Sequence, residues 1–317
     1  MTPQLTHGRV AEAAAFLGPR IRRTPVEYSS QLSEKMGVPV WLKLEFLQLT
    51  GSFKLRGAWW RLNEASSAER RTGVATCSAG NHGKGVAYAA REEGIKAVIF
   101  VPRSVDEAKY KGMVALGADV RRSEYDGYDD TETWAREESA RLGMPFISAF
   151  DDYDVMAGNG GTLALECFEQ VPDASGFLLP VGGGGLSAGF AFMAEGKRLI
   201  GCQHELSPAL RLSLDRGEAV TKLPYVETVA SGVEGGIGSL TFGVLRDRIQ
   251  EVTLVSEEDV RRATRWMAEE HQYWVEPTSA VTVAACLSGR VQLTGPTVVL
   301  VCGRNVSAST MSSILNG

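Results

Sequence analysis

The sequence predicts an α/β protein in which mostly parallel, twisted sheets carry helices on both faces. Short β-branched runs lack polar alternation, as strands buried on both faces do, at 96–102, 176–182, 197–203 and 296–303. Amphipathic stretches with helical spacing lie between such runs, at 82–94, 105–117 and 256–271. Strands that alternate with helices need crossover connections, and these connections produce parallel sheets.

The chain has 317 residues, which is long enough for two lobes that share an interface. The strand–helix series between residues 73 and 149 can form a small sheet of its own within the larger protein. We therefore expect a large domain of residues 1–72 and 150–317, which binds the ligand, and a small mobile domain of residues 73–149 on the substrate side.

Composition is that of an ordinary soluble globular protein, with 44% apolar and 22% charged residues. The net charge of −5 is spread along the chain, so we expect no nucleic-acid partner. The sequence contains no signal-peptide pattern and no apolar run of membrane-spanning length, which predicts a cytoplasmic protein without membrane association. Five cysteines form no spaced framework and are expected to be reduced. They are Cys77, Cys167, Cys202, Cys286 and Cys302.

The strongest local motif is "LLPVGGGGLSAG", in which a buried-type strand runs into four glycines before a helix that begins near Leu186. Gly182, Gly183, Gly184 and Gly185 leave backbone N–H groups uncovered at that helix N-terminus, and such groups attract a phosphate dianion. Ordering four glycines between two ordered elements costs considerable conformational entropy, which a loop without a ligand would not offset. The motif therefore favours phosphate binding.

The same glycines leave a second class of enzyme open. Gly183, Gly185 and Ala188 fit a loose G-x-G-x-x-A pattern, and Glu205 ends the next strand, where a ribose-binding acid belongs. A nicotinamide-dependent dehydrogenase is therefore the alternative interpretation from another class.

Two further turns carry polar groups. In "TCSAGNHGKG" the residues from Ser78 to His82 join a strand to a helix and offer an anion pocket of carboxylate size, or simply a capped turn. In "GSFKLRGA" Lys54 follows Phe53 at the apparent start of a helix, and alone it would be an ordinary surface lysine. One cofactor, pyridoxal 5'-phosphate, needs a reactive lysine, a phosphate site and a carboxylate pocket together.

These motifs, followed by "VCGRN", resemble in order those of the fold type II (tryptophan synthase β-like) pyridoxal-phosphate enzymes. Within that group they are similar to the threonine/serine dehydratase and serine racemase branch. The resemblance runs from about Thr24 to Asn305, and "LEFLQLTGSFK" and "VEPTSAV" share it. It implies a two-lobed protein that carries pyridoxal 5'-phosphate and forms a homodimer.

The resemblance also implies a role for each site residue. Lys54 would carry the cofactor, Phe53 would lie against its ring, and Asn81 would hydrogen-bond the ring hydroxyl. The phosphate would be held by Gly182, Gly183, Gly184 and Gly185. The substrate carboxylate would be bound by Ser78, Ala79, Gly80, Asn81 and His82. Cys302 would face the pyridine nitrogen, where a thiol is too weak a donor to hold that nitrogen protonated.

The implied reaction is β-elimination of a 3-hydroxy L-amino acid such as L-threonine or L-serine, which yields a 2-oxo acid and ammonia. Lys54 would be the catalytic base, assisted by Ser78. A serine racemase, or a dehydratase for 3-hydroxyaspartate or an aryl-serine, remains the alternative. Ala79 stands where the racemases have a serine hydroxyl, so we expect elimination to exceed racemisation.

Some residues depart from the resemblance. Arg304 stands where many threonine dehydratases have glycine, which points to an acidic or unusual substrate. Gln203 and Ala209 stand where the racemase branch has carboxylates, so no metal site is expected. The sequence ends at Gly317, and from this we expect no C-terminal regulatory domain and no isoleucine inhibition.

Overall fold

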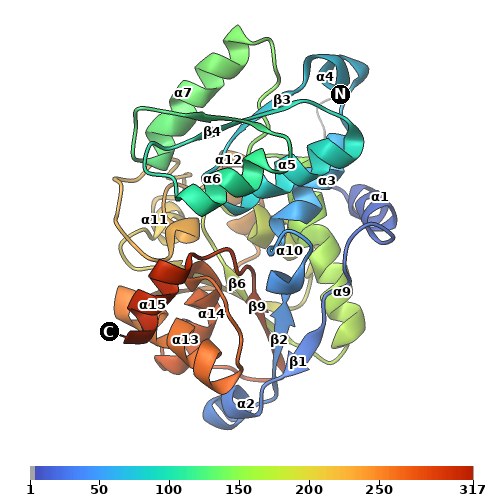
Figure 1. Cartoon of the computed structure of the whole chain (residues 1–317). Coiled ribbons are helices and arrows are strands. Elements are labelled where there is room, and N and C mark those ends of the chain that lie inside the picture. Colours follow the sequence, from blue (N-terminus) through green and yellow to red (C-terminus); the bar gives the residue numbers. More distant parts are fainter. Residues whose placement is uncertain (1–3, 317) are drawn as a thin grey trace.

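The larger of two sheets has six strands in the order β1-β2-β9-β6-β7-β8, in a computed structural model that describes residues 4–316 (Figure 1). Only the β1–β2 pair is antiparallel, and the other four pairs are parallel. The predicted α/β class with mostly parallel sheets is thus confirmed. The strands are β1 (Val26–Tyr28), β2 (Val40–Leu44), β6 (Gly176–Pro180), β7 (Arg198–His204), β8 (Glu251–Val255) and β9 (Thr297–Val301).

The smaller sheet has three parallel strands, β3 (Val74–Cys77), β4 (Ala97–Val101) and β5 (Asp119–Arg122). Helix α7 (Tyr128–Arg141) lies along it (Figure 1). Phe100 of β4 and Trp134 of α7 pack edge to face. All of these elements fall within residues 73–149. That this segment moves as a separate domain stays a prediction.

Helices cover both faces of the larger sheet because alternate strand residues point to opposite cores. Leu300 belongs to one apolar core, with helices α1, α3, α9 and α10, whereas its neighbours Val299 and Val301 belong to the other, with α13 and α14. The helices on these two faces are α1 (His7–Leu17), α2 (Ser30–Met36), α3 (Lys54–Asn63), α9 (Thr162–Gln170), α10 (Gly185–Met193), α13 (Glu257–Glu270) and α14 (Pro277–Leu287).

The remaining helices connect these layers and cover the smaller sheet. They are α4 (Ser67–Thr72), α5 (Asn81–Glu93), α6 (Glu107–Val114), α8 (Tyr153–Met156), α11 (Ala209–Arg216), α12 (Ser239–Leu245) and α15 (Ala308–Asn316). Short turns of other helix types are η1 (Glu45–Leu47), η2 (Ala157–Gly161) and η3 (Ser231–Val233), of which η2 is π-helical. Asn159 in η2 accepts a 2.8 Å hydrogen bond from the Gly57 N–H group and so supports α3.

A buried ion cluster fixes the start of helix α3. Arg56 is fully buried and donates two 2.8 Å hydrogen bonds to Glu45 and one of 2.7 Å to Glu166. Buried Lys43 donates to Glu166 at 2.8 Å from strand β2. Because buried charges persist only when they are paired and hydrogen-bonded, this cluster holds the first turn of α3, which contains Lys54, against the sheet.

Two expectations from composition can be compared with the structure. All five cysteines are buried, and none of them forms a disulfide. Across residues 4–316 no helix combines the length and the apolar character that a membrane crossing requires.

Candidate active site

Lys54 lies at the carboxyl end of the larger sheet because its segment pairs with the residues after β9. The Phe53 N–H group donates to the Cys302 carbonyl at 3.1 Å, and the Arg304 N–H group donates to the Gly51 carbonyl at 2.9 Å. Ser52 and Gly303 form an antiparallel bridge between these bonds. Three residues singled out from sequence, Phe53, Lys54 and Cys302, are therefore brought together.

The Lys54 side chain is half-buried, which is not the exposed position that a lone lysine would ordinarily have. Its Nζ atom donates to the Ala149 carbonyl at 3.0 Å and lies 5.4 Å from the centroid of the Phe53 ring. Burial lowers the pKa of Lys54 from 10.5 to about 8, against the opposing charge of Glu276. A neutral amine, which can act as nucleophile or base, is therefore accessible near neutral pH.

The four-glycine loop joins β6 to α10 and packs on the segment that also contacts Lys54. A Cβ atom on Gly183 would lie 2.3 Å from the ring of Phe150, which directly follows Ala149. Gly184 has a φ of 91°, in the left-handed region, and abuts Thr241. Thr241 Oγ1 donates a 2.7 Å hydrogen bond to the Gly183 carbonyl, and this bond holds the loop in place.

The amide groups of this loop are left without partners. In the described part of the chain, the N–H groups of Gly182, Gly183, Gly184 and Gly185 donate to no oxygen. Backbone donors at a helix N-terminus rarely stay unpaired unless water or an anion satisfies them. The loop therefore fits a phosphate group, as the sequence predicts.

The β3–α5 turn faces the same region. Helix α5 packs directly on α3, since a Cβ atom on Gly85 would lie 3.3 Å from the Leu55 backbone. Within the turn the Gly80 N–H group donates to Ser78 Oγ at 3.2 Å, and Ser78 is buried. The half-buried Ala79 packs against the apolar residues beneath α6. This turn opens α5 with small residues, and its location agrees with a carboxylate pocket beside Lys54.

His82 is buried in this turn, and neither of its ring nitrogens has a hydrogen-bond partner within residues 4–316. Burial, and then the charge of nearby Lys54, lower the pKa of His82 well below its usual range, so the ring is neutral. A buried polar ring without partners calls for an explanation, and a bound polar ligand supplies one.

Three polar residues that the sequence interpretation did not assign complete the site. Glu276, which precedes α14, accepts a 2.6 Å hydrogen bond from Asn81 Nδ2, and Asn81 Oδ1 accepts one of 2.6 Å from Asn305. Lys84 donates to Asn305 at 2.9 Å. Burial raises the pKa of Glu276 to about 7. The motifs "VEPTSAV" and "VCGRN" contain two of these residues, but no spacing shows that they meet Asn81.

Cys302 follows β9 and is held by Ser279 of α14. Ser279 Oγ lies 3.2 Å from Cys302 Sγ and accepts a 2.5 Å hydrogen bond from the Gly303 N–H group. Burial raises the pKa of Cys302 to about 12, so this group is a neutral thiol. A neutral thiol is a weak donor and acceptor, in line with the chemistry expected at this position.

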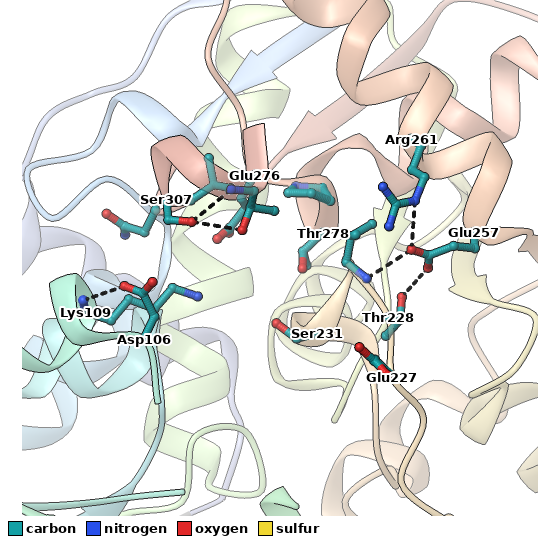
Figure 2. A pocket seen from close by; sticks show the side chains of 15 residues that line it. Asp106, Lys109, Glu227, Thr228, Ser231, Glu257, Arg261, Glu276, Thr278 and Ser307 are labelled. Carbon is teal, nitrogen blue, oxygen red and sulfur yellow. Dashed lines mark hydrogen bonds and ion pairs between the residues drawn. The ribbon is translucent and has the colours of Figure 1, made fainter. Parts of the chain in front are cut away.

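A polar cavity of about 520 Å³ opens next to Glu276 (Figure 2). Asp106 and Lys109 line it from the α6 side, and Arg261 and Glu257 line it from α13 opposite, where they form a 3.3 Å ion pair. Among the described residues, Lys54, the β3–α5 turn and the glycine loop do not line this cavity, which adjoins their site through Glu276 and Asn305.

Of the other residues noted in the sequence, Gln203 and Glu205 have partners of their own, whereas Arg304 adjoins the site between Gly303 and Asn305. Gln203 hydrogen-bonds the Val181 carbonyl and the Arg211 N–H group, and no cluster of three metal-ligating side chains occurs among residues 4–316. Glu205 pairs with Arg290 at 3.6 Å. Arg304 is exposed, and its Cγ atom lies next to Gly51.

The residues present fit pyridoxal 5'-phosphate. The unpaired amides of the glycine loop suit its phosphate, the half-buried amine of Lys54 suits its aldehyde, and the neutral Cys302 suits its ring nitrogen. A parallel α/β fold with these three groups at the carboxyl end of the larger sheet defines a fold type II pyridoxal-phosphate enzyme. Residues 17–303 match the sequence model described as "Pyridoxal-phosphate dependent enzyme", and the chain belongs to this family. This membership decides against the dehydrogenase alternative.

Comparison with similar proteins shows to which branch of this family the chain belongs. The chain is 37% identical to an L-threonine ammonia-lyase from Geobacter sulfurreducens, over 98% of this chain and 78% of that protein. It is 33% identical to the catabolic L-threonine dehydratase of Escherichia coli, over 96% of this chain and 94% of that protein. Among solved structures, maize serine racemase has a TM-score of 0.90 at 29% identity, over 96% of this chain and 95% of that one. A threonine deaminase from Solanum lycopersicum has a TM-score of 0.88 at 31% identity, over 98% of this chain and 93% of that one. The chain therefore lies in the dehydratase and racemase branch.

Proposed function

We propose that the protein catalyses β-elimination of 3-hydroxy L-amino acids such as L-threonine and L-serine, with release of a 2-oxo acid and ammonia. The observation that carries this proposal is the half-buried Lys54 amine, whose pKa is lowered to about 8, together with the unpaired amides of Gly182–Gly185, which pack on Phe150 next to the Ala149 partner of that amine. Several relatives are named as threonine ammonia-lyases or dehydratases, and this supports the same substrate class.

When bound, pyridoxal 5'-phosphate supplies an aldehyde that captures an amino group and a ring that withdraws electrons from Cα. Lys54 and Phe53 would hold its aldehyde end, and Gly182–Gly185 would bind its phosphate. Cys302 would face its ring nitrogen, and Asn81 its ring hydroxyl.

The substrate carboxylate would bind at the start of α5. There the Ser78 hydroxyl and the N–H groups of residues 79–82 lie at the positive end of the helix dipole. This contact would orient the Cα–H bond of the substrate toward Lys54.

The Lys54 amine is then the base. In its neutral form Nζ accepts the proton from the substrate Cα, and the electron pair left at Cα expels the β-hydroxyl group, which leaves with a proton as water. The resulting enamine is released and takes up water to give the 2-oxo acid and ammonia. For L-threonine the product is 2-oxobutanoate, and for L-serine it is pyruvate.

Serine racemisation is the second candidate, because maize serine racemase has a similar structure. It needs a proton donor on the face of Cα opposite Lys54. The methyl group of Ala79 cannot give or accept a proton, and it packs against the apolar residues beneath α6. Elimination is therefore favoured over racemisation.

Three further properties belong to this proposal. Residues 73–149 would move as a small domain that closes over the substrate, since Asp106 and Lys109 line one side of the cavity from that segment. The protein would act as a homodimer in the cytoplasm. Size-exclusion chromatography with light scattering tests the dimer.

A panel of substrates tests the function. The holoenzyme is incubated with L-threonine, L-serine, threo-3-hydroxyaspartate and phenylserine, and release of 2-oxo acid is measured. Lys54→Ala is the inactive control. Release from L-threonine and L-serine supports the proposal. Release only from 3-hydroxyaspartate would move the assignment to an acidic substrate, and none from any of the four would refute elimination.

A further inference from the structure

A chain of hydrogen bonds links helix α5 to the loops that follow β9 and precede α14. Lys84 Nζ donates to Asn305 Oδ1 at 2.9 Å, and Asn305 Nδ2 donates to Asn81 Oδ1 at 2.6 Å. Asn81 Nδ2 then donates to Glu276 Oε1 at 2.6 Å. Asn305 Nδ2 also donates to the Thr50 carbonyl at 2.9 Å. Every bond in the chain runs in one direction, from the ammonium toward the carboxylate.

Lys84 and the Thr50 carbonyl fix the orientation of both amides. An ammonium group can only donate, and a backbone carbonyl can only accept. Asn305 must therefore turn its oxygen to Lys84 and its NH₂ group to Thr50 and Asn81. Asn81 must in turn direct its NH₂ group toward Glu276. One N–H bond of that NH₂ group is used by Glu276, and the other remains for a ligand.

We propose that Lys84 is a positioning residue, which acts through Asn305 to present the second N–H bond of Asn81 to the ring oxygen of the cofactor. This inference rests on the proposed function, in which Asn81 faces that ring. Lys84 itself touches neither cofactor nor substrate in this role.

The charge of Lys84 strengthens the chain beyond what a neutral donor would provide. Hydrogen bonds to an ionised group are stronger than neutral ones, and neighbouring bonds in a chain polarise one another. Without Lys84, the oxygen of the half-buried Asn305 loses its donor, and Asn81 loses the support that fixes its amide.

Lys109 supplies a matched control. It is a half-buried lysine that lines the cavity beside Glu276. Its ammonium forms no ion pair or hydrogen bond with any residue from 4 to 316 in this conformation, so it contributes charge near Glu276 without holding an amide. Removal of Lys109 therefore separates a general charge effect from the positioning of Asn81.

The test measures cofactor binding rather than turnover. Apoenzyme of the wild type, Lys84→Met, Lys84→Arg and Lys109→Met is titrated with pyridoxal 5'-phosphate, and the dissociation constant and visible absorption maximum are recorded. Lys84→Met should bind about tenfold more weakly, the loss typical of one charge-assisted hydrogen bond, with a shifted absorption maximum. Lys84→Arg should restore both properties. Lys109→Met, which removes only a charge near Glu276, should lose less affinity than Lys84→Met and should keep the wild-type absorption maximum.

Two results would overturn the inference. One is a Lys84→Met protein with wild-type affinity and absorption maximum, and the other is a Lys109→Met protein with the same losses as Lys84→Met. Circular dichroism establishes that each variant is folded. If Lys84→Met does not fold, Asn305→Leu breaks the same chain and carries the same expectations. If wild-type protein forms no borohydride-stable adduct at Lys54, the proposed function fails; if it does and Lys84→Met is unchanged, only the role of Lys84 fails.

Discussion

Replacement of Lys54 by methionine should stabilise the cofactor-free protein at neutral pH, although it abolishes the proposed activity. Lys54 is half-buried in the native state, and desolvation of its amine lowers its pKa there to about 8 from 10.5. Below pH 8 the native protein therefore holds a buried charge that the unfolded chain keeps in water. Methionine has a similar length and no charge, so the substitution removes this cost.

The magnitude follows from the two pKa values. A fall from 10.5 to about 8 corresponds to about 3 kcal/mol of lost stability at pH 7. The substitution also leaves the Ala149 carbonyl without its 3.0 Å donor, which costs about 1 kcal/mol. The net gain at pH 7 should be about 2 kcal/mol, or about 3 °C in Tm for a chain of this size.

The sign of the effect changes with pH. Because the folded pKa of Lys54 lies below the unfolded value, wild-type stability rises between pH 8 and pH 10.5, where the unfolded chain binds the extra proton. Above pH 10.5 neither state is charged, and only the lost hydrogen bond to Ala149 remains. Lys54→Met should therefore be about 1 kcal/mol less stable than wild type there.

Urea unfolding of the two apoproteins at pH 7 and pH 10.5 measures both differences. Lys111→Met, at an exposed lysine on α6, is the matched control and should change stability little at either pH. The reasoning is refuted if Lys54→Met is less stable than wild type at pH 7, or if the difference is the same at both pH values.

Three other predictions use the same structure. Gly183→Ala should weaken pyridoxal 5'-phosphate binding at least tenfold in equilibrium dialysis, because its Cβ atom would overlap a ring at 2.3 Å; Gly112→Ala, with no atom within 4 Å, should not. Ala79→Ser should increase D-serine formation from L-serine more than pyruvate formation, as resolved by chiral chromatography, and unchanged D-serine would refute the role assigned to that methyl group. Arg56→Met should cost about 3 to 5 kcal/mol in urea unfolding, because it leaves buried carboxylates unpaired, and a loss below about 1 kcal/mol would contradict this.

The sequence predicts the elements of this fold well where buried strands and capped helices give regular patterns. The run at 296–303 becomes β9, and the stretch at 256–271 becomes α13, with Ser256 and Asp259 in a reciprocal cap. The three motif turns could be found because glycine and small polar residues interrupt those patterns at strand ends. Lys54 could be assigned only from the combination of the three motifs and from the resemblance, since nothing local shows that a lysine will be buried.

The polar network behind the site could not be predicted in the same way. Asn81 and Glu276 are separated by 195 residues, and Lys84 and Asn305 by 221. Such contacts depend on how the two sheets place their loops next to each other, and the hydrophobic periodicity of the sequence does not predict that placement. The π-helical turn at η2, which lets Asn159 reach the Gly57 amide, likewise follows from close helix packing rather than from a local sequence signal.

Attachment of the cofactor to Lys54 is tested most directly by reduction of the purified holoenzyme with borohydride, followed by mapping of the modified peptide by mass spectrometry. The cofactor should be found on Lys54, within the peptide that contains "GSFKLRGA", and Lys54→Ala should carry none. A cofactor fixed to another lysine, or a wild-type protein that retains no pyridoxal 5'-phosphate, would contradict this assignment.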